Sequence, residues 1–472
     1  MRPPRSSDRG LVVTTSEAAS QTGSIEIPST ILAANVPLPS PLLGRGFLAG
    51  GEGESTIDLS LPSSPFPQGG VEKSAGLDRR QFIAASAALA LAGLPSLVRA
   101  VDAPPTAPAA APSTAWPSFR NGNQLRGIAT SSLPTKLEVL WKESVQDGIT
   151  ATAAIVGVHV FAATLGGELI CYERLTGKRV WTYFSAPRKK PDDFIAGFQS
   201  SPTVTRELVL VGDEDGRMHA VDRASGKPRW KFETGAEIIA SAAVVGERVI
   251  FGSYDSTLYC VKLADGEEVW KFKTQDRING SPAIAGNLTF VTGCDQHLRA
   301  INIETGQEKF DLPLERFMIA SPAVFDSMLY VGTHEGEFLA IDITKPEVTW
   351  RYSEPGKEQP YHSSAALTEE RVIVGCQDKL LHCFDRKTGK QQWAFAANGQ
   401  INSSPVLVGG DRLFVGSNDG HLYEIGIADG KQRWKQKLGR SIAASPAVGE
   451  GCLVIGAEGT EGAIYCLGAK VA

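Results

Sequence analysis

Residue patterns that carry common chemistries are scarce in this sequence. The 472 residues have a formal net charge of −5, which gives no reason to expect a nucleic-acid partner. The seven cysteines include no Cys-x-x-Cys pair, so neither a zinc motif nor a redox pair is indicated. Gly-x-Ser-x-Gly, P-loop and His-Glu-x-x-His motifs are absent, and the seven histidines do not pair at metal-ligand spacing. We therefore predict no catalytic residues and no metal site.

The first quarter of the chain has the composition of an export leader followed by a linker. Arg79-Arg80 precede an apolar run from Phe82 to Leu97, and small residues follow at a possible cleavage site. The paired arginines resemble a twin-arginine signal, with an ordinary secretory signal as the alternative. The predicted segments are a disordered leader or misassigned start (1–77), a signal peptide (78–100), a Pro/Ala linker (101–115) and the folded domain (116–472).

What the sequence has in abundance is one repeated phrase of 13 letters. Its copies begin with an apolar residue and end on an aromatic residue, and six of the seven pass through a Thr/Ser/Asp-Gly turn. The seven copies lie at Leu169–Trp181, Met218–Trp230, Leu258–Trp270, Leu298–Phe310, Phe338–Trp350, Leu381–Trp393 and Leu422–Trp434. A fixed repeat of about 40 residues indicates a solenoid, a propeller or another array.

Each repeat contains four short apolar runs, which predict four antiparallel strands. A small-residue triplet such as Ser200–Pro202 opens the first run, and a β-branched run ending in Gly follows it. Asp-Gly pairs such as Asp215-Gly216 then predict a hairpin turn. Four antiparallel strands in each repeat indicate an all-β propeller, and eight triplets indicate eight blades.

The last repeat stops after its third strand, so its fourth strand has to come from elsewhere. Residues 136–145 carry Trp141 and have no blade before them. We predict that this N-terminal strand completes the eighth blade and leaves the ring without a free edge. On this interpretation Trp116 lies outside the ring, and truncation to residue 130 is expected to matter less than loss of residues 136–145.

The aromatic residue that ends each phrase is predicted to be structural. A bulky ring at a fixed place in every blade is suited to fill the gap between neighbouring blades. The predicted blade-packing residues are Trp141, Trp181, Trp230, Trp270, Phe310, Trp350, Trp393 and Trp434.

The repeat resembles that of the PQQ-like, or quinoprotein-type, β-propellers. Ala220-Val221-Asp222, Ser225-Gly226 and Trp230 match its phrase letter for letter. The resemblance implies one of two branches. Quinoprotein alcohol and sugar dehydrogenases use a calcium-bound pyrroloquinoline quinone, a catalytic Asp and often adjacent cysteines, and this chain has no adjacent cysteines. BamB-type scaffolds of outer-membrane protein assembly are binding rings, but they carry a lipid-bearing Cys that this chain lacks.

Binding is predicted at the channel mouth formed by the loops from the fourth strand of one blade to the first strand of the next. A long loop at 185–199 and another at 353–362 are expected to expose aromatic anchors, with arginines as hydrogen-bond donors around them. The candidate residues are Phe194, Phe198, Glu237, Arg277, Asn279, Arg316, Tyr361, His362, Gln400, Asn402 and Arg440. The opposite face consists of turns whose residues serve the turn geometry.

Two functions remain open from the sequence. The first is a non-enzymatic, exported propeller that binds an envelope protein or a small ligand at its mouth, without cofactor and as a monomeric ring. The alternative is a dehydrogenase of alcohols or sugars that uses pyrroloquinoline quinone with calcium. Both place the protein in the periplasm or elsewhere in the bacterial cell envelope, with no transmembrane span in the mature chain.

Overall fold

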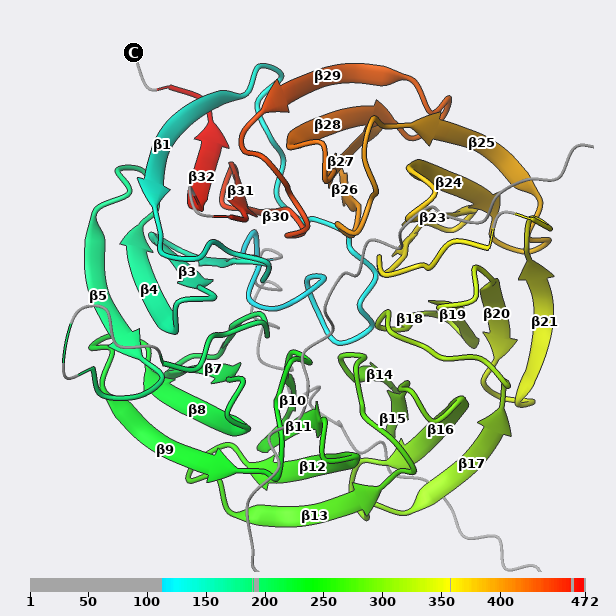
Figure 1. Cartoon of the computed structure of the whole chain (residues 1–472), viewed down its shortest axis with the longest axis horizontal. Coiled ribbons are helices and arrows are strands. Elements are labelled where there is room, and N and C mark those ends of the chain that lie inside the picture. Colours follow the sequence, from blue (N-terminus) through cyan, green and yellow to red (C-terminus); the bar gives the residue numbers. More distant parts are fainter. Residues whose placement is uncertain (1–112, 189, 191–194, 357, 460–461, 471–472) are drawn as a thin grey trace, which may run out of the picture. The chain divides into compact units, whose positions relative to one another are not determined.

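A computed structural model describes residues 113–188, 190, 195–356, 358–459 and 462–470. These residues form eight four-stranded antiparallel sheets arranged as the blades of one ring (Figure 1). The all-β, eight-bladed propeller predicted from the repeats is confirmed. Among the described residues there is no helix long and apolar enough to cross a membrane. The predicted leader and signal, residues 1–100, lie outside the described residues, as do residues 101–112 of the linker.

The strands follow the repeats, and blades are numbered in chain order. Blade 1 consists of β2 (Ala154–Val156), β3 (His159–Ala163), β4 (Glu168–Glu173) and β5 (Arg179–Phe184), and blade 2 of β6 (Thr203–Val204), β7 (Leu208–Gly212), β8 (Arg217–Asp222) and β9 (Pro228–Glu233). Blade 3 consists of β10 (Ala243–Val245), β11 (Arg248–Ser253), β12 (Thr257–Lys262) and β13 (Glu268–Lys273), and blade 4 of β14 (Ala283–Ala285), β15 (Leu288–Val291), β16 (His297–Asn302) and β17 (Glu308–Pro313). Blade 5 consists of β18 (Ala323–Phe325), β19 (Met328–Gly332), β20 (Phe338–Asp342) and β21 (Glu347–Tyr352). Blade 6 consists of β22 (Ala366–Leu367), β23 (Arg371–Gly375), β24 (Leu380–Asp385) and β25 (Gln391–Ala396). Blade 7 consists of β26 (Val406–Val408), β27 (Arg412–Gly416), β28 (His421–Gly426) and β29 (Gln432–Lys437). Blade 8 is β30 (Ala447–Gly449), β31 (Cys452–Ala457) and β32 (Ala463–Gly468), with β1 (Glu138–Ser144) as its outer strand.

Ring closure by the N-terminal strand is also confirmed. Strand β1 pairs antiparallel with β32, with Trp141 opposite Cys466 and Ser144 opposite Ala463. Blade 8 is therefore assembled from both ends of the folded region, as the cyan β1 beside the red β32 shows in Figure 1. This pairing leaves β32 without an open edge.

The tryptophans at the ends of the phrases pack against the turn of the next blade. Each of six indole rings lies over a turn glycine whose φ is +67° to +76°. The contact is so close that a Cβ atom added to the glycine would lie only 2.6–2.7 Å from the nearest ring atom. The pairs are Trp141/Gly177, Trp181/Gly226, Trp230/Gly266, Trp270/Gly306, Trp350/Gly389 and Trp393/Gly430. Only glycine combines this backbone conformation with so close a contact. The aromatic column therefore joins neighbouring blades.

Hydrogen bonds give each of these indoles a fixed orientation. The Nε1–H of Trp141 donates to the carbonyl of Arg174 at 2.7 Å, and that of Trp270 donates to Ile303 at 2.8 Å. Phe310 has no such donor, and the turn that follows it, in blade 5, contains Pro346 where other turns have glycine. At the junction of blades 4 and 5, both the aromatic residue and the turn residue that it faces therefore differ from the other junctions.

Two predicted exposures are wrong, because the loops between blades are anchored by a buried residue in each copy. This residue donates its backbone N–H to the previous blade, and in six of the eight copies its side chain packs against the glycine at or near the end of that blade's second strand. The eight anchors are Ile149, Phe198, Ile238, Ile278, Met318, Tyr361, Ile401 and Ile442, each at most 2% exposed. Phe198 and Tyr361 therefore serve as loop anchors and are not available to a partner. Phe194 lies outside the described residues.

The position of Trp116 is the second correction. Trp116 is fully buried, and its backbone exchanges two hydrogen bonds with Ile155 in the innermost strand of blade 1. From there residues 114–129, the inner segment, run around the channel and bond to the innermost strand, or the turn after it, in every blade. The partners are Ile155, Val204, Val244, Ile284, Val324, Leu367, Leu407 and Glu450, at 2.7–3.1 Å. The inner segment is drawn in cyan inside the ring in Figure 1.

Arg120 fastens the inner segment to blades 6 and 7. Its guanidinium is buried and donates to the carbonyl oxygens of Pro405 at 2.6 Å and Ala365 at 2.7 Å. Burial lowers the pKa of Arg120 to about 9, which still leaves the side chain charged at neutral pH. The innermost strands would otherwise present unpaired backbone edges to the channel, and the inner segment pairs with them.

Candidate binding site at the channel mouth

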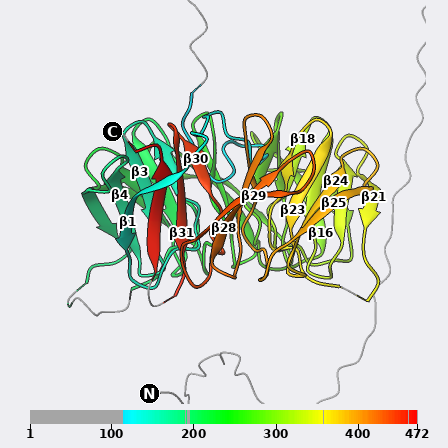
Figure 2. The same cartoon turned by 90° about the horizontal axis from the view of Figure 1, so that it is seen from above.

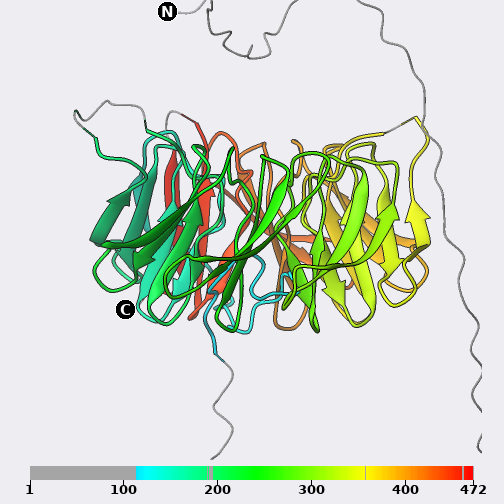
Figure 3. The same cartoon turned by 90° about the horizontal axis from the view of Figure 1, so that it is seen from below.

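The two faces of the ring differ in construction. The inner segment lies at the rim with the first-to-second and third-to-fourth turns, here called the turn face (Figures 2 and 3). The fourth-to-first loops enter at the other rim, here called the loop face. Each loop there accepts a hydrogen bond from the hairpin between the second and third strands of the blade it enters, here called the tip hairpin, at 2.8–3.2 Å. The donors are Leu165, Glu214, Tyr254, Cys294, His334, Gln377, Asn418 and Glu458.

Beneath the mouth, a chain of serines links the blades around the channel. The central serine of one triplet offers its backbone N–H to the hydroxyl of the next triplet's serine. Six such bonds of 2.8–3.0 Å are formed, the first of them donated by a threonine. They run from Thr152 to Ser201, Ser201 to Ser241, Ser241 to Ser281, Ser281 to Ser321, Ser364 to Ser404 and Ser404 to Ser445. Small residues are required here because the innermost strands approach one another most closely at the axis. The triplets found in the sequence therefore line the channel.

Polar side chains of blades 5 to 7 meet at the mouth. The amide of Gln377 lies 3.2 Å from Nδ1 of His362 and donates to Asn402 at 3.1 Å. The rings of His334 and His362 stack with centroids 6.0 Å apart. Two of the predicted residues, His362 and Asn402, are thus brought together, and a tip-hairpin residue joins them.

Several polar atoms at this mouth are buried and have no hydrogen-bond partner among the described residues. They are Oγ1 of Thr150, Nε2 of His362 and Oδ1 of Asn418. Burial, together with the neighbouring His334, lowers the pKa of His362, so its imidazole is neutral at pH 7. Buried polar groups are rarely left unpaired in proteins. The three residues are only half-buried, so a small shift of their side chains would offer these atoms to a molecule bound at the mouth.

The other predicted residues are spread around the loop face. Glu237, Arg277 and Arg440 are exposed, and Arg277 lies over the ring of Tyr254 at 5.5 Å. Arg316 is half-buried and bound to Glu337 at 3.1 Å.

Two further predicted residues take part in the contacts between loops and tip hairpins. Asn279 is buried and donates to Sγ of Cys294 at 2.8 Å. Gln400 accepts the backbone N–H of Asn418 through its carbonyl. The structure thus gives the predicted arginines separate surroundings and does not gather them at one point.

The sequence-based interpretation missed the contribution of the tip hairpins. Tyr254, His334, Gln377 and Asn418 occupy one position in blades 3, 5, 6 and 7, two residues after the glycine at or near the end of the second strand. Aligning the repeats at the glycine that ends this strand would have shown a column of varied polar residues. Such variation at a fixed turn position is a signal of surface use.

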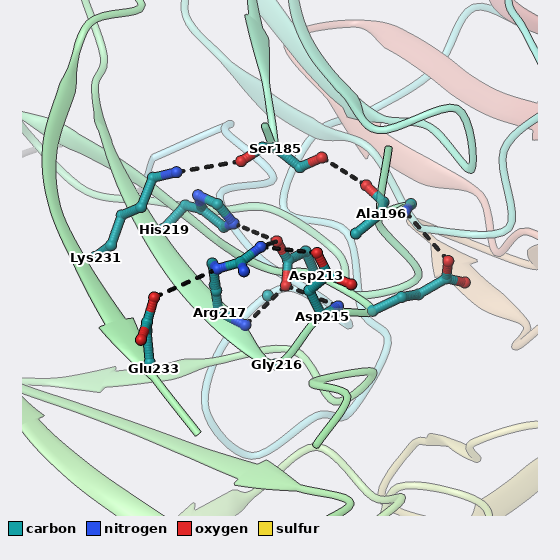
Figure 4. Close-up of polar contacts among 12 residues, drawn as sticks. Ser185, Ala196, Asp213, Asp215, Gly216, Arg217, His219, Lys231 and Glu233 are labelled. Atoms are coloured by element: carbon teal, nitrogen blue, oxygen red, sulfur yellow. Dashed lines mark hydrogen bonds and ion pairs between the residues drawn. The ribbon is translucent and has the colours of Figure 1, made fainter. Parts of the chain in front are cut away.

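Blade 2 contains a buried Asp–His–Tyr chain that resembles catalytic machinery in its order. Nε2 of His219 lies 2.8 Å from Oδ2 of Asp213 (Figure 4). Its Nδ1 lies 2.9 Å from the hydroxyl of Tyr183 in blade 1. Asp213 also accepts the backbone N–H of Arg217 at 2.7 Å. The side chains of Asp213 and His219 are fully buried, so no substrate reaches them. This chain joins blades 1 and 2 and positions the tip hairpin.

The buried imidazole predicts a pH dependence of stability. Desolvation lowers the pKa of His219 below 6.5, although Asp213 opposes the shift. Below pH 6.5 the unfolded chain binds a proton that the folded chain does not, so the free energy of unfolding falls as pH falls, by at most about 1.4 kcal/mol per pH unit. His219→Gln, measured by urea unfolding between pH 7 and 5, is expected to flatten this fall. Parallel profiles for the two proteins would contradict the assignment.

Hollows on the turn face offer a competing surface. One of about 380 Å³ is lined by His159, Arg206, Glu207, Arg223 and neighbours, and another of about 520 Å³ by Arg412, Glu424 and neighbours. Much of their charge is already paired, as in Arg412–Glu424 at 2.7 Å and Arg229–Asp222 at 3.0 Å. Buried polar atoms without a partner among the described residues occur at both rims, including Nε1 of Trp116 and Nε of Arg126 in the inner segment. The mouth differs in its uncharged polar cluster of His362, Gln377 and Asn402.

Comparison with known proteins places this ring in a family. Residues 198–471 match the family model described as the β-propeller of the β-alanine-activating enzyme. The chain belongs to this family. Its repeats and neighbours make it a PQQ-like, quinoprotein-type propeller.

Individual relatives fall in both branches of the quinoprotein-type propellers. The propeller is 29% identical over 112 residues to the outer membrane protein assembly factor BamB of Xanthomonas campestris, and 28% identical over 107 residues to quinohemoprotein alcohol dehydrogenase ADH IIB of Pseudomonas putida. These matches span 22% and 21% of this chain, but only 28% and 15% of the relatives' lengths.

Solved structures agree on the fold. BamB from Moraxella catarrhalis superposes with a TM-score of 0.59 at 18% identity, covering 71% of this chain and all of the other. The quinohemoprotein alcohol dehydrogenase from Comamonas testosteroni gives 0.65 at 14% identity, covering 76% and 81%. At these identities the likeness concerns the fold alone.

Proposed function

We propose that this propeller is an exported, non-enzymatic binding scaffold that holds a segment of a protein partner at its loop face. The observation that carries the proposal is the polar cluster of His362, Gln377 and Asn402 at the mouth. Beside it, Nε2 of His362 and Oδ1 of Asn418 have no hydrogen-bond partner among the described residues. Backbone amides of a polypeptide can satisfy such atoms, and leaving each unsatisfied costs about 1–3 kcal/mol. The likeness to an outer membrane assembly factor supports a protein partner and a place in the cell envelope.

The alternative, quinone-dependent dehydrogenation, has weaker support in the residues present. Calcium takes six to eight oxygen ligands, several of them carboxylates. Among the described residues, the one group of three His, Cys, Asp or Glu side chains close enough to share an ion is Cys376, Asp378 and His382, which holds a single carboxylate. Near the mouth, Glu214 already accepts bonds from Gly197 and Gln199, and Glu458 accepts one from Ala443. These residues do not fit a calcium-bound quinone.

Capture of an envelope partner tests the site. We expect the wild-type ring to retain a partner from envelope extract. His362→Ala combined with Asn418→Ala should weaken retention about 5- to 150-fold, since each of the two lost hydrogen bonds contributes about 0.5–1.5 kcal/mol. Arg206→Ala, in a hollow of the turn face, is the matched control and should bind as wild type. Retention that survives the mouth substitutions but is lost with Arg206→Ala would place the site on the turn face.

Reconstitution separates the two functions. The protein is incubated with pyrroloquinoline quinone and calcium, and dye reduction is followed with alcohols and sugars as substrates. We expect no turnover above the quinone in buffer. Sustained turnover that needs the folded protein would overturn the scaffold proposal and favour the dehydrogenase.

A further inference from the structure

The tip hairpins of blades 3 and 7 share one pattern, from which blade 6 departs at two positions. In blades 3 and 7 the first hairpin residue is Ser, the third is Asp, and the seventh is Tyr. The tyrosine hydroxyl donates to the aspartate, as in Tyr259 to Asp255 at 2.7 Å and Tyr423 to Asp419 at 2.5 Å. Blade 6 keeps the aspartate but has Cys376 in the first position and His382 in the seventh. Both substitutions introduce a metal-ligating side chain.

These two residues and the aspartate between them converge on one point. Sγ of Cys376, a carboxylate oxygen of Asp378 and a ring nitrogen of His382 all lie within 4.8 Å of one another. Nε2 of His382 is 2.8 Å from Oδ2 of Asp378. In a tetrahedral zinc site with ordinary bond lengths, ligand atoms are about 3.3–3.8 Å apart. Movements of about 1 Å would therefore bring the three donors to a shared ion.

The surroundings hold the histidine ring in a fixed orientation. The side-chain NH2 of Gln391 donates to Nδ1 at 2.9 Å, and Nε2–H donates to Asp378. Coordination through Nε2 therefore requires the ring proton to move to Nδ1 and the Gln391 amide to turn so that its oxygen accepts that proton. The ring of Phe384 stacks on the imidazole at an angle of 6°.

Blade 2 shows what the same histidine position does without the cysteine. There His219 pairs with Asp213, which stands in the hairpin position of Cys376. The histidine of blade 2 has one acidic partner and the tyrosine hydroxyl, so two groups saturate it. In blade 6 the acid stands two residues later, and the cysteine adds a third donor.

We propose that Cys376, Asp378 and His382 form a binding site for one zinc ion in the tip hairpin of blade 6. A thiolate, an imidazole and a carboxylate are the ligands zinc takes in proteins, and three of them leave a fourth position for water. Cys376 and His382 are almost completely buried, while the Asp378 side chain is 14% exposed and opens the site to solvent. On binding, the thiol releases its proton to solvent. Hard ions such as calcium are excluded by the sulfur and nitrogen donors.

Cobalt and zinc titrations of the reduced, chelator-treated full chain test this site. We expect one equivalent of Co²⁺ to produce a sulfur-to-cobalt charge-transfer absorption that one equivalent of Zn²⁺ removes. Cys376→Ser and His382→Tyr recreate residues that blades 3 and 7 carry in these positions, so both variants should fold. Each is expected to abolish the absorption and to weaken zinc binding at least about 100-fold, because even second-layer changes cost 10- to 100-fold.

Cys383→Ser is the matched control, because Cys383 is a buried neighbour on the opposite face of β24 and should leave the titration unchanged. X-ray absorption of the zinc-loaded wild-type protein gives a readout that needs no variant, with one sulfur expected at about 2.3 Å. A zinc shell without sulfur would overturn the site. So would the absence of saturable cobalt binding, or an unchanged absorption in Cys376→Ser.

Discussion

A chain that begins at residue 131 is expected to be largely unfolded at room temperature. This truncation removes the inner segment, which hydrogen-bonds to all eight blades. Loss of a buried tryptophan such as Trp116 costs about 3–5 kcal/mol. Each charged hydrogen bond of Arg120 contributes about 1.5–3 kcal/mol more. Together these approach the whole stability of an ordinary domain, about 5–15 kcal/mol.

A chain that begins at residue 113, the first that the structure describes, is the matched control and should unfold with the same midpoint as the full chain. Far-ultraviolet circular dichroism and thermal unfolding distinguish the two truncations. Within the longer chain, Trp116→Ala should reproduce part of the loss without any change of chain length. A chain from residue 131 that melts like the control would mean that the inner segment contributes no stability.

Replacing Trp141 with alanine is expected to lower the free energy of unfolding by about 3–5 kcal/mol. The indole is 8% exposed, contacts Gly177 and Tyr172 of blade 1, and bonds to Arg174. It therefore joins blade 8 to blade 1, at the junction where the ring closes. The truncated side chain would leave a cavity and an unpaired carbonyl at that junction.

Trp434 provides the control for Trp141. It ends the same phrase in blade 7. In the other blades a turn between the third and fourth strands receives the indole, but in blade 8 these strands are β32 and β1, which no turn connects. Trp434 is only half-buried and makes no indole hydrogen bond among the described residues. Trp434→Ala should therefore destabilise the protein clearly less than Trp141→Ala in urea unfolding. Equal losses would show that docking on the next blade's turn adds nothing to the packing of the ring.

The sequence-based predictions succeeded where one repeat contains the relevant physical signal. Short apolar runs and turn glycines specify strands and hairpins locally, and the eight small-residue triplets specify the blade number. The missing fourth strand of the last repeat pointed to β1, because an unpaired strand edge is unfavourable. The interpretation of the loops was wrong for Phe198 and Tyr361, because an aromatic residue in a long loop can also be the loop's anchor. Their alignment with Ile238 and Ile278 in the other loops is the signal that separates the two cases.

The amino-acid sequence by itself determined the fold class, the eight blades, the closure of the ring and the positions of the tryptophans, because these follow from local periodicity repeated along the chain. Only the tertiary structure decided the path of the inner segment, because most of its hydrogen bonds are made by backbone groups and its few side-chain donors, Arg120 and Asn123, occur once and follow no repeat. It also decided which polar side chains meet at the mouth, since His362, Gln377 and Asn402 come from separate strands and loops. The grouping of Cys376, Asp378 and His382 likewise depends on the bend of a hairpin, which brings together donors that the linear spacing keeps apart.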